Sequence, residues 1–457
     1  MTHTAKVDDR GLSASATAGR LTVFGAGYLG VTHAAAMAEL GHRVLVVDTD
    51  ELKLAKLSGG EVPFFEPGLQ DMVLTNIASG RLSFTDSYTE AADFATVHFI
   101  GVGTPQKNGE NGADLRQVEA VITELAPLLT GPCVIIGKST VPVGTAKRLL
   151  DLTRQLSPAG DEVELVWSPE FLREGRAIAD TLHPDRIVLG LDADHPKGRA
   201  EAVFREVYAD ILADGMPVLV TDLATAELVK VAANAFLATK ISFINAIADV
   251  CDSVGADVGI LADALGHDER IGRRFLDAGV GFGGGCLPKD LRAFRARAGE
   301  LGVDLTLLRD VDEINLGRRE RVVELALEAV GGSFAGSKVA VLGAAFKPQS
   351  DDVRDSPALN VAGQVHLKGA HVSVYDPIAM DNSRLLFPTL TYAPSAEDAV
   401  AGADVVLVLT EWAEFTTLDP KTLGGTVRGK VVVDGRNCLD RDRWKSAGWR
   451  YIGMGRS

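Results

Sequence analysis

The chain has 457 residues, of which 46% are hydrophobic and 24% are charged. At roughly 100 to 200 residues per domain, this length predicts two to four domains, and the composition excludes a disordered or fibrous protein. The 62 acidic and 46 basic side chains give a formal net charge of −16, which disfavours nucleic acid or an anionic membrane as the main partner. Any anionic ligand must therefore be bound by local positive groups.

The four cysteines, Cys133, Cys251, Cys286 and Cys438, are far apart in the sequence and form no CxxC pair. They predict neither a disulfide framework nor a zinc site, and the histidines show no metal-ligand spacing. We therefore expect no metal, and reduced thiols in the cytoplasm. Residues 1–19 are polar and lack the apolar stretch of a signal peptide, so we interpret them as a disordered tail. No stretch approaches the roughly 18 consecutive apolar residues of a membrane span.

An α/β pattern begins at Arg20. Two short apolar runs, LTVFGAG and RVLVVD, flank a helical segment that ends near Gly41. Further strands are predicted in residues 96–105, 133–140 and 163–169. Apolar strands that alternate with helices are typical of a parallel sheet. Residues up to about 215 are therefore predicted to form one α/β domain.

The middle of the chain lacks a strand signal. From about Thr221 to Gly266, Ala, Leu, Val and Ile recur at helical spacing, which predicts a long central helix and its neighbours. A second series of strands and helices follows. Its strands are predicted in residues 337–346, 371–377, 403–412 and 430–437.

The first chemical motif is GAGYLG, which lies between a predicted strand and a predicted helix. Gly25, Gly27 and Gly30 allow a tight turn and the close approach of a pyrophosphate, and the helix N-terminus supplies unpaired N–H groups. Asp48 ends the next strand, where the dinucleotide fingerprint places an acidic residue for the adenosine ribose. A carboxylate there repels a 2′-phosphate, so NAD is favoured over NADP, and Lys53 nearby is the feature that tempers this preference. The alternative is a glycine-rich turn without a ligand.

A second motif, VGFGGGCLPKDL, places Cys286 after a run of glycines, with Pro288 just inside a predicted helix start. The dipole of such a helix N-terminus stabilises a thiolate, which is the form that a nucleophile needs. Asp290 lies one helical turn later and can hold a water or a neighbouring lysine. A lone cysteine is more often a small buried hydrophobe, but the glycines and Asp290 favour the nucleophile.

A third motif is the pair Lys230 and Asn234, which share one face of the central helix. An ammonium beside an amide is suited to stabilising a developing oxyanion. The alternative is a snorkelling lysine and a surface asparagine, which would be favoured without the other motifs.

Taken together, the motifs form a long series. GAGYLG, PFFEPGL, VGTP, KSTVPVGT, SPEFLREG, HPDRIVLG, NAFLATKISF, GFGGGCLPKD, AAFKPQSDDVRDSPA, YDP and DGRN occur in this order between residues 25 and 437. This series resembles the UDP-glucose/GDP-mannose dehydrogenase family, most closely the members that act on UDP-glucose. The resemblance implies that UDP-glucose is oxidised to UDP-glucuronate with two NAD, through a cysteine-bound thiohemiacetal and thioester.

Alternatives remain beside this activity. GDP-mannose or UDP-N-acetylmannosamine is the alternative substrate, since the catalytic residues would be the same. A non-catalytic NAD-binding redox sensor that uses Cys286 is a distant alternative. A two-electron hydroxyacid dehydrogenase shares the first domain but has no use for a nucleophilic cysteine.

The resemblance implies an α/β protein of three parts. These are an N-terminal Rossmann domain for NAD (20–215), a central helical dimerisation domain (216–325) and a C-terminal Rossmann-like domain for the UDP-sugar (326–457). The active site is expected in the cleft between them, with Cys286 facing the nicotinamide. We expect a homodimer or a larger homo-oligomer.

The resemblance also implies a role for each matching residue. The implied catalytic residues are Cys286 as nucleophile, Lys230 and Asn234 as oxyanion stabilisers, Asp290 as a water-positioning neighbour, Glu170 as general acid/base for thioester hydrolysis, and Thr140, which helps to place water. The implied cofactor contacts are Gly25, Gly27, Tyr28, Leu29, Gly30, Asp48, Lys53, Thr104, Thr140, Glu174, Lys289 and Arg354. The implied substrate contacts are Glu170, Phe171, Leu172, Glu174, Lys230, Asn234, Gly283, Lys347, Arg436 and Arg270, the last resembling an arginine that reaches a neighbouring subunit's site. For Glu170, the alternative is a solvated loop carboxylate.

Four positions depart from the family pattern. Ser168 stands where asparagine is common, and His183 where aspartate is common; His183 is interpreted as a structural variation. Gly285 replaces a usual serine, and Leu287 replaces a usual phenylalanine. The nucleophile and the base are both retained, so activity is expected. Gly285 and Leu287 bear on the fine shape of the sugar pocket.

Overall fold

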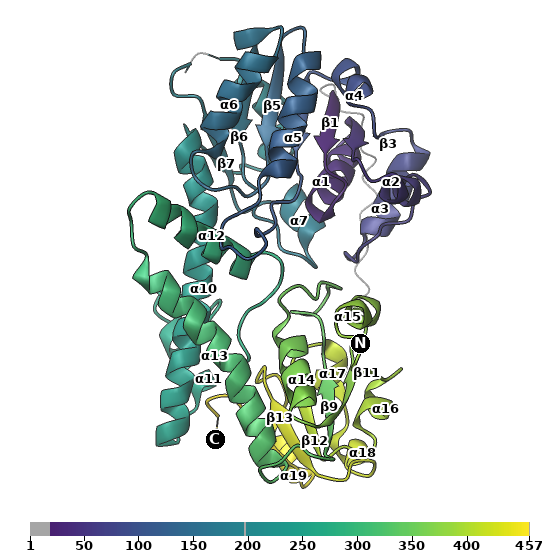
Figure 1. Ribbon diagram of the computed structural model, residues 1–457, viewed down its shortest axis with the longest axis vertical. Helices are drawn as coiled ribbons and strands as arrows, with labels where there is room; N and C mark the ends of the chain where they lie inside the picture. The colour runs from purple at the N-terminus through teal and green to yellow at the C-terminus, as the bar shows by residue number, and fades with distance from the viewer. Residues whose placement is uncertain (1–18, 196–197, 457) are drawn as a thin grey trace. The chain divides into compact units, whose positions relative to one another are not determined.

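The structure is a computed structural model that describes residues 19–195 and 198–456. The tail predicted for residues 1–19 lies outside this range except for Gly19. The chain divides into two compact units (Figure 1). Unit 1 runs to Glu227, except for two loops, 64–66 and 105–114, which belong with unit 2, and unit 2 continues from Leu228 onward.

Unit 1 is built on a parallel sheet of eight strands within the described residues. The strand order is β3-β2-β1-β4-β5-β6-β7-β8, and in the described chain the antiparallel contact is the one between β6 and β7, where Trp167 pairs with Gly190. The strands are β1 (Arg20–Phe24), β2 (Arg43–Val47), β3 (Leu82–Thr85), β4 (Val97–Ile100), β5 (Cys133–Gly137), β6 (Val163–Trp167), β7 (Ile187–Leu191) and β8 (Val218–Asp222). The order reverses between β1 and β4, which is the switch point where doubly wound sheets bind ligands.

Helices cover both faces of this sheet. On β4, the Phe99 ring packs edge to face on His33 of α1, with ring centroids 4.6 Å apart, whereas the next residue, Ile100, packs into a core with Val118 of α5 and Leu149 of α6. Successive strand side chains point to opposite faces, so α1 and α5 lie on opposite sides. The helices are α1 (Tyr28–Glu39), α2 (Glu51–Ser58), α3 (Leu69–Ala78), α4 (Tyr88–Phe94), α5 (Arg116–Leu125), α6 (Thr145–Leu156), α7 (Ala177–Leu182), α8 (Ala200–Val207) and α9 (Ala209–Ala213).

Three strands of unit 1, β3, β7 and β8, were not among the predicted ones. Strand β8 is an edge strand on which Leu219 and Val220 are exposed, so it lacks the buried run that indicates a central strand. Its residues from Val218 to Asp222 pair with β7. The sheet therefore extends past the predicted domain boundary at residue 215. The central helix consequently begins at Leu223 rather than Thr221.

Unit 2 begins within the long helix α10 (Leu223–Val254) and continues with α11 (Val258–Gly266), α12 (Leu287–Glu300) and α13 (Thr306–Ala329). By length and composition α10 could cross a membrane, but it is a packed helix, with 44% of its apolar window buried. Its Ser242 hydroxyl donates to the Val311 carbonyl at 2.8 Å, and the Asn245 side-chain oxygen accepts the Gly279 N–H at 2.8 Å. Buried polar contacts of this kind are those of a core helix.

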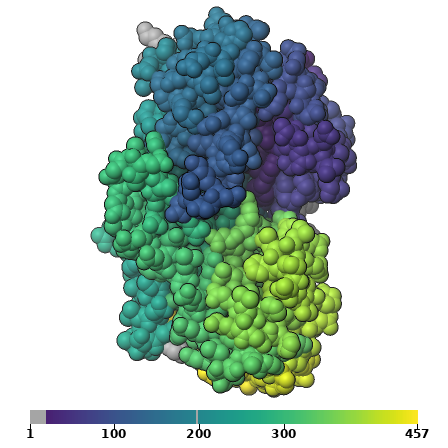
Figure 2. All heavy atoms as spheres, viewed as in Figure 1, coloured from purple at the N-terminus to yellow at the C-terminus, as the bar shows by residue number. Residues whose placement is uncertain are grey.

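The rest of unit 2 is a second parallel sheet, in the order β11-β10-β9-β12-β13-β14. Its strands are β9 (Lys338–Leu342), β10 (His371–Tyr375), β11 (Thr391–Tyr392), β12 (Val405–Val408), β13 (Val431–Asp434) and β14 (Arg450–Ile452). Its helices are α14 (Pro357–Leu367), α15 (Met380–Leu386), α16 (Ala396–Val400), α17 (Ala413–Thr417), α18 (Pro420–Leu423) and α19 (Arg441–Ser446). The short strands β11 and β14 were not predicted, and the predicted boundary at residue 326 falls inside α13. In Figure 2, the green to yellow atoms of this part of unit 2 form a closely packed surface.

Candidate active site

The glycine loop of unit 1 is closely packed on one side and open on the other. A side chain at Gly30 would place its Cβ 1.7 Å from the Gly25 carbonyl oxygen, and one at Gly25 would lie 2.9 Å from the Val102 backbone. At Gly27, which caps α1, a Cβ would meet nothing within 4 Å. The open side coincides with the helix N-terminus, where N–H groups can bind phosphate, so these residues fit a dinucleotide.

Asp48 connects this loop to the end of β2. Its carboxylate accepts the Ala26 N–H at 2.7 Å and the Lys53 ammonium at 3.0 Å. The Lys53 amine and the Asp48 carboxylate are therefore an ion pair, with side chains 30% and 13% exposed. Lys53 reduces the negative field that Asp48 would present to a 2′-phosphate, as the sequence suggests.

We expect Asp48→Ala to shift cofactor use toward NADP. Loss of the carboxylate removes a repulsion of about 1 to 3 kcal/mol against a 2′-phosphate and leaves Lys53 to attract it. The ratio of kcat/KM for NAD to that for NADP should fall roughly tenfold or more. In the control Asp48→Ala/Lys53→Ala, the gain with NADP should be lost. An unchanged ratio in Asp48→Ala would show that Asp48 does not face the 2′ position.

Other predicted cofactor residues also lie together in unit 1. The Thr104 hydroxyl donates to the Thr140 carbonyl at 2.7 Å. The Tyr28 hydroxyl, at the start of α1, accepts the Gly175 N–H at 3.2 Å. Leu29 follows in the same turn, and the N–H of Gly175 adjoins Glu174. The glycine loop is therefore tied directly to the loop that follows β6.

This loop, residues 168–176, carries Glu170, Phe171, Leu172 and Glu174. The Arg186 guanidinium lies over the Phe171 ring, 4.0 Å from its centroid. The Arg173 side chain binds the Asp180 carboxylate through two nitrogens, at 2.8 and 2.6 Å. These contacts fix the loop at the end of the sheet where strands deliver ligand-binding residues.

Glu170 is not a solvated loop carboxylate. Its Oε2 lies 2.9 Å from the Lys138 ammonium, and the two side chains are 13% and 6% exposed. Burial acts to raise the pKa of Glu170, but the Lys138 charge and the Phe171 N–H outweigh it and hold the pKa below its usual value. Sequence reasoning assigned no role to Lys138. The sequence feature that could have identified Lys138 is its position directly after the buried strand CVIIG.

The nucleophile candidate lies in unit 2. Cys286 is the N-cap residue of α12, with Pro288 in the first turn, as predicted, and its thiol is exposed and outside any disulfide. The other cysteines are different: burial raises the pKa of Cys133 to about 12, and burial also raises the pKa of Cys251 and Cys438. Of the four cysteines, Cys286 is therefore the one whose exposure and helix-capping position fit a nucleophile.

Asp290 lies one turn into α12 and is almost fully buried. Its Oδ2 accepts the Asn234 side-chain N–H at 2.7 Å, and its Oδ1 accepts the Lys289 ammonium at 2.6 Å. Lys230 is half-buried one helical turn before Asn234 on α10. Asn234 and Lys289 thus contact Asp290 near the start of α12. The neighbouring lysine that Asp290 was expected to hold is Lys289.

A segment after β9 packs against the glycines before the nucleophile. The Gly284 N–H donates to the Arg354 carbonyl at 3.0 Å, and the Arg354 side chain binds Asp352 through two nitrogens, at 2.9 and 2.7 Å. A Cβ at Gly285 would lie 2.2 Å from the Arg354 guanidinium carbon. Glycine at position 285, the residue before Cys286, therefore leaves room for this cation.

Three further predicted substrate residues of unit 2 each have their own kind of contact. Gly283 packs so closely that a Cβ would lie 2.4 Å from the Asp355 carbonyl oxygen. The Arg436 guanidinium donates to the carbonyls of Leu409, Gly281 and Phe346 at 2.9 to 3.0 Å, so it also joins three backbone segments. The Lys347 ammonium lies 5.2 Å from the centroid of the Phe346 ring.

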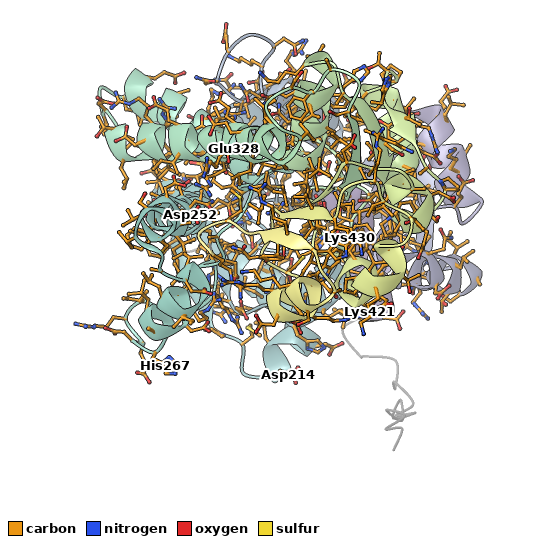
Figure 3. All side chains as sticks on the ribbon, turned by 90° about the horizontal axis from the view of Figure 1, so that it is seen from below. Asp214, Asp252, His267, Glu328, Lys421 and Lys430 are labelled. Atoms are coloured by element: carbon orange, nitrogen blue, oxygen red, sulfur yellow. The ribbon has the colours of Figure 1, made fainter. Side chains whose placement is uncertain are left out.

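Arg270 lies in the loop after α11. Its side chain is 89% exposed and pairs with Asp268 at 2.6 Å. The loop begins at His267, the C-cap of α11, whose side chain points away from the ribbon in Figure 3. The loop is therefore exposed in the single chain, and the predicted reach toward a second subunit remains a prediction.

The second sheet carries an acidic residue at the position that corresponds to Asp48. Asp376 directly follows β10, but it is fully buried. Its Oδ2 accepts the N–H groups of Ala344 and Ala345 and the Trp412 indole N–H, all within 3.0 Å. Because the Asp376 carboxylate is fully buried and its Oδ2 is occupied by these donors, it is not accessible to a ribose. Within the described residues, the open dinucleotide loop is in unit 1.

An open dinucleotide loop in a doubly wound sheet, in one chain with a helix-capping cysteine, fits an NAD-dependent oxidoreductase. The chain belongs to the UDP-glucose/GDP-mannose dehydrogenase family, because models of the family's NAD binding domain, central domain and UDP binding domain match residues 19–212, 224–316 and 340–441. The predicted family, the predicted fold class and NAD as cofactor are confirmed.

Individual relatives match nearly the whole chain. It is 44% identical over 437 residues to a UDP-glucose 6-dehydrogenase of Rhizobium meliloti (strain 1021), covering 96% of this chain and 99% of that protein. It is 41% identical to UDP-glucose 6-dehydrogenase TuaD of Bacillus subtilis (strain 168), covering 96% and 93%. The solved structure of a UDP-glucose dehydrogenase from Pyrobaculum islandicum matches with a TM-score of 0.89 and 36% identity, covering 98% and 100%.

Proposed function

We propose that this protein oxidises UDP-glucose to UDP-glucuronate with two NAD per sugar, through a covalent intermediate on Cys286. The observation that carries the proposal is the exposed Cys286 thiol at the N-terminus of α12, one turn from the buried Asp290. Similar proteins that bear the name UDP-glucose 6-dehydrogenase support the choice of substrate.

NAD supplies the hydride acceptor, and one is needed for each oxidation. The C6 alcohol first loses a hydride and a proton to give an aldehyde. The Cys286 thiolate then adds to the aldehyde carbon, and Lys230 and Asn234 stabilise the oxyanion of the resulting thiohemiacetal. Loss of the second hydride gives a thioester. Water then cleaves the thioester, with Glu170 as the base and with Asp290 and Thr140 helping to position the water. The Cys286 thiolate is the leaving group.

A substrate panel tests the reaction. Purified protein and NAD should produce two NADH for each UDP-glucose, with UDP-glucuronate and no released aldehyde. Its kcat/KM for UDP-glucose should exceed that for GDP-mannose and UDP-N-acetylmannosamine by at least about tenfold. A higher value for either competitor would assign the protein to that sugar, and one NADH per sugar would exclude the covalent reaction.

We also propose that two copies associate through α10. Phe236, Phe243 and Val250 are spaced seven residues apart on this helix and are 66%, 50% and 57% exposed. A repeat of seven places them along one stripe, and exposed apolar residues that share one stripe mark an interaction surface. A second copy presents the same stripe, so a two-fold dimer would cover both.

Phe243→Glu is expected to convert the dimer into a monomer. A charge at the centre of the stripe would be buried without a partner, which is strongly unfavourable. Sedimentation should show that the dissociation constant rises by roughly tenfold or more. Leu385→Glu, on α15 and 80% exposed, is the matched control and should remain a dimer. A dimeric Phe243→Glu protein would place the interface elsewhere.

A further inference from the structure

The proposed mechanism uses Glu170 as a base but gives no role to Lys138, which forms an ion pair with it. Lys138 directly follows β5, and Glu170 lies in the loop after β6, so the pair joins the ends of two adjacent strands. Both side chains are nearly buried. Taking two charges out of water is costly, and the cost is met only when the geometry is good and further hydrogen bonds are made.

The surroundings of Lys138 are aromatic. Its ammonium donates to the Tyr208 hydroxyl at 3.3 Å, and the Tyr208 ring stacks on Phe204 with centroids 4.3 Å apart. The His33 ring also lies near Tyr208, with ring centroids 6.4 Å apart. Burial lowers the pKa of His33 to about 3, so His33 is neutral near pH 7. The charge that faces Glu170 in this cluster is therefore that of Lys138.

Both oxygens of the Glu170 carboxylate are held. Oε2 binds the Lys138 ammonium at 2.9 Å, and Oε1 accepts the adjoining Phe171 N–H at 2.8 Å. A carboxylate held by donors on both oxygens has a fixed plane, and each oxygen keeps a lone pair that can accept a proton from water. In its ionised form Glu170 accepts protons and cannot donate one.

We propose that Lys138 is a positioning residue, which keeps Glu170 deprotonated and oriented as the base for thioester hydrolysis. This inference rests on the proposed function. The water oxygen bonds to the thioester carbon, its proton passes to Glu170, the carbon–sulfur bond breaks, and Cys286 leaves as the thiolate. Glu170 later returns the proton to solvent. Loss of Lys138 should therefore impair hydrolysis and spare the two hydride steps.

Lys138→Met tests this division, because methionine keeps much of the side chain's length and removes the charge. On rapid mixing with UDP-glucose and NAD, the variant should release a burst of two NADH per active site and then turn over about 10²-fold more slowly than wild type. Intact-protein mass spectrometry should show the sugar nucleotide bound to Cys286. Lys138→Arg keeps the charge and should recover much of the rate. Lys147→Met is the matched control: the Lys147 side chain, on α6, is 44% exposed and pairs with the surface carboxylates of Asp151 and Asp194, and the variant should behave as wild type.

Glu170→Gln separates this proposal from the proposed function. It should show the same burst and adduct. Suppose that Glu170→Gln shows this burst and adduct. If Lys138→Met then turns over at the wild-type rate, or turns over slowly without forming the adduct, the proposed role of Lys138 is excluded. If Glu170→Gln turns over normally, the role of Glu170 fails and that of Lys138 fails with it.

The double variant Lys138→Met/Glu170→Gln guards against misfolding, since it leaves no unpaired buried charge. Its affinity for NAD reports whether unit 1 is folded. If Lys138 acts through Glu170, the double variant should be no slower than Glu170→Gln alone. A further large loss would give Lys138 a separate role and overturn the proposal.

Discussion

Cys286→Ser should fail to release UDP-glucuronate, with steady-state turnover lowered by at least about 10²-fold. A thiol at a helix N-terminus is readily ionised, whereas a serine hydroxyl stays protonated near neutral pH and adds poorly to an aldehyde. Without the addition, no thiohemiacetal presents the second hydride. NADH release and UDP-glucuronate, measured together against wild type, give the result, and an unchanged rate with two NADH per sugar would refute the covalent mechanism.

The other three cysteines are the matched controls for this substitution. Cys133→Ser, Cys251→Ser and Cys438→Ser should keep most of the turnover, because none of these residues caps the helix that Cys286 begins. Cys133 is buried in the core of unit 1, so a hydroxyl there is expected to lower stability by about 1 to 3 kcal/mol. A loss of turnover in Cys251→Ser or Cys438→Ser, with stability intact, would mean that Cys286 alone does not explain the chemistry.

Features that depend on sequence neighbours were predictable. The turn at Gly25 to Gly30 and the start of α12 at Cys286 each use residues that are adjacent in the chain, so their patterns can be recognised directly. The acidic residue Asp48 follows from the same fingerprint. The spacing of Lys230 and Asn234 places them on one helix face. For these features, the local sequence is enough to predict the local geometry.

Features that depend on packing between distant segments were not predictable. Lys138 and Glu170 meet because β5 and β6 are adjacent in the sheet, and nothing local to either residue indicates the other. The same holds for Asp376, which ends β10 much as Asp48 ends β2. Only the fold shows that Trp412 and backbone N–H groups enclose Asp376, while Asp48 stays partly exposed. The sequence shows which residue type follows a strand, but only the burial of that residue in the fold decides whether its side chain can reach a ligand.

Lys230→Ala should lower turnover by about 10² to 10³-fold while NAD binds almost as well as to wild type. The oxyanion exists only during reaction, so a group that stabilises it contributes to kcat rather than to the affinity for the cofactor. Asn234 cannot replace this charge, because one of its two side-chain N–H groups donates to Asp290 at 2.7 Å and the amide is neutral. We therefore expect Asn234→Ala to be the milder change.

Steady-state rates and NAD titrations on the same protein samples separate the two outcomes for Lys230. The control is Lys421→Ala, an exposed lysine on α18 that is labelled in Figure 3, and it should change neither quantity. Equal losses of turnover and of NAD affinity would point to a structural role for Lys230. Unchanged turnover would return Lys230 to the alternative of a snorkelling lysine, and the oxyanion would then need a different cationic donor.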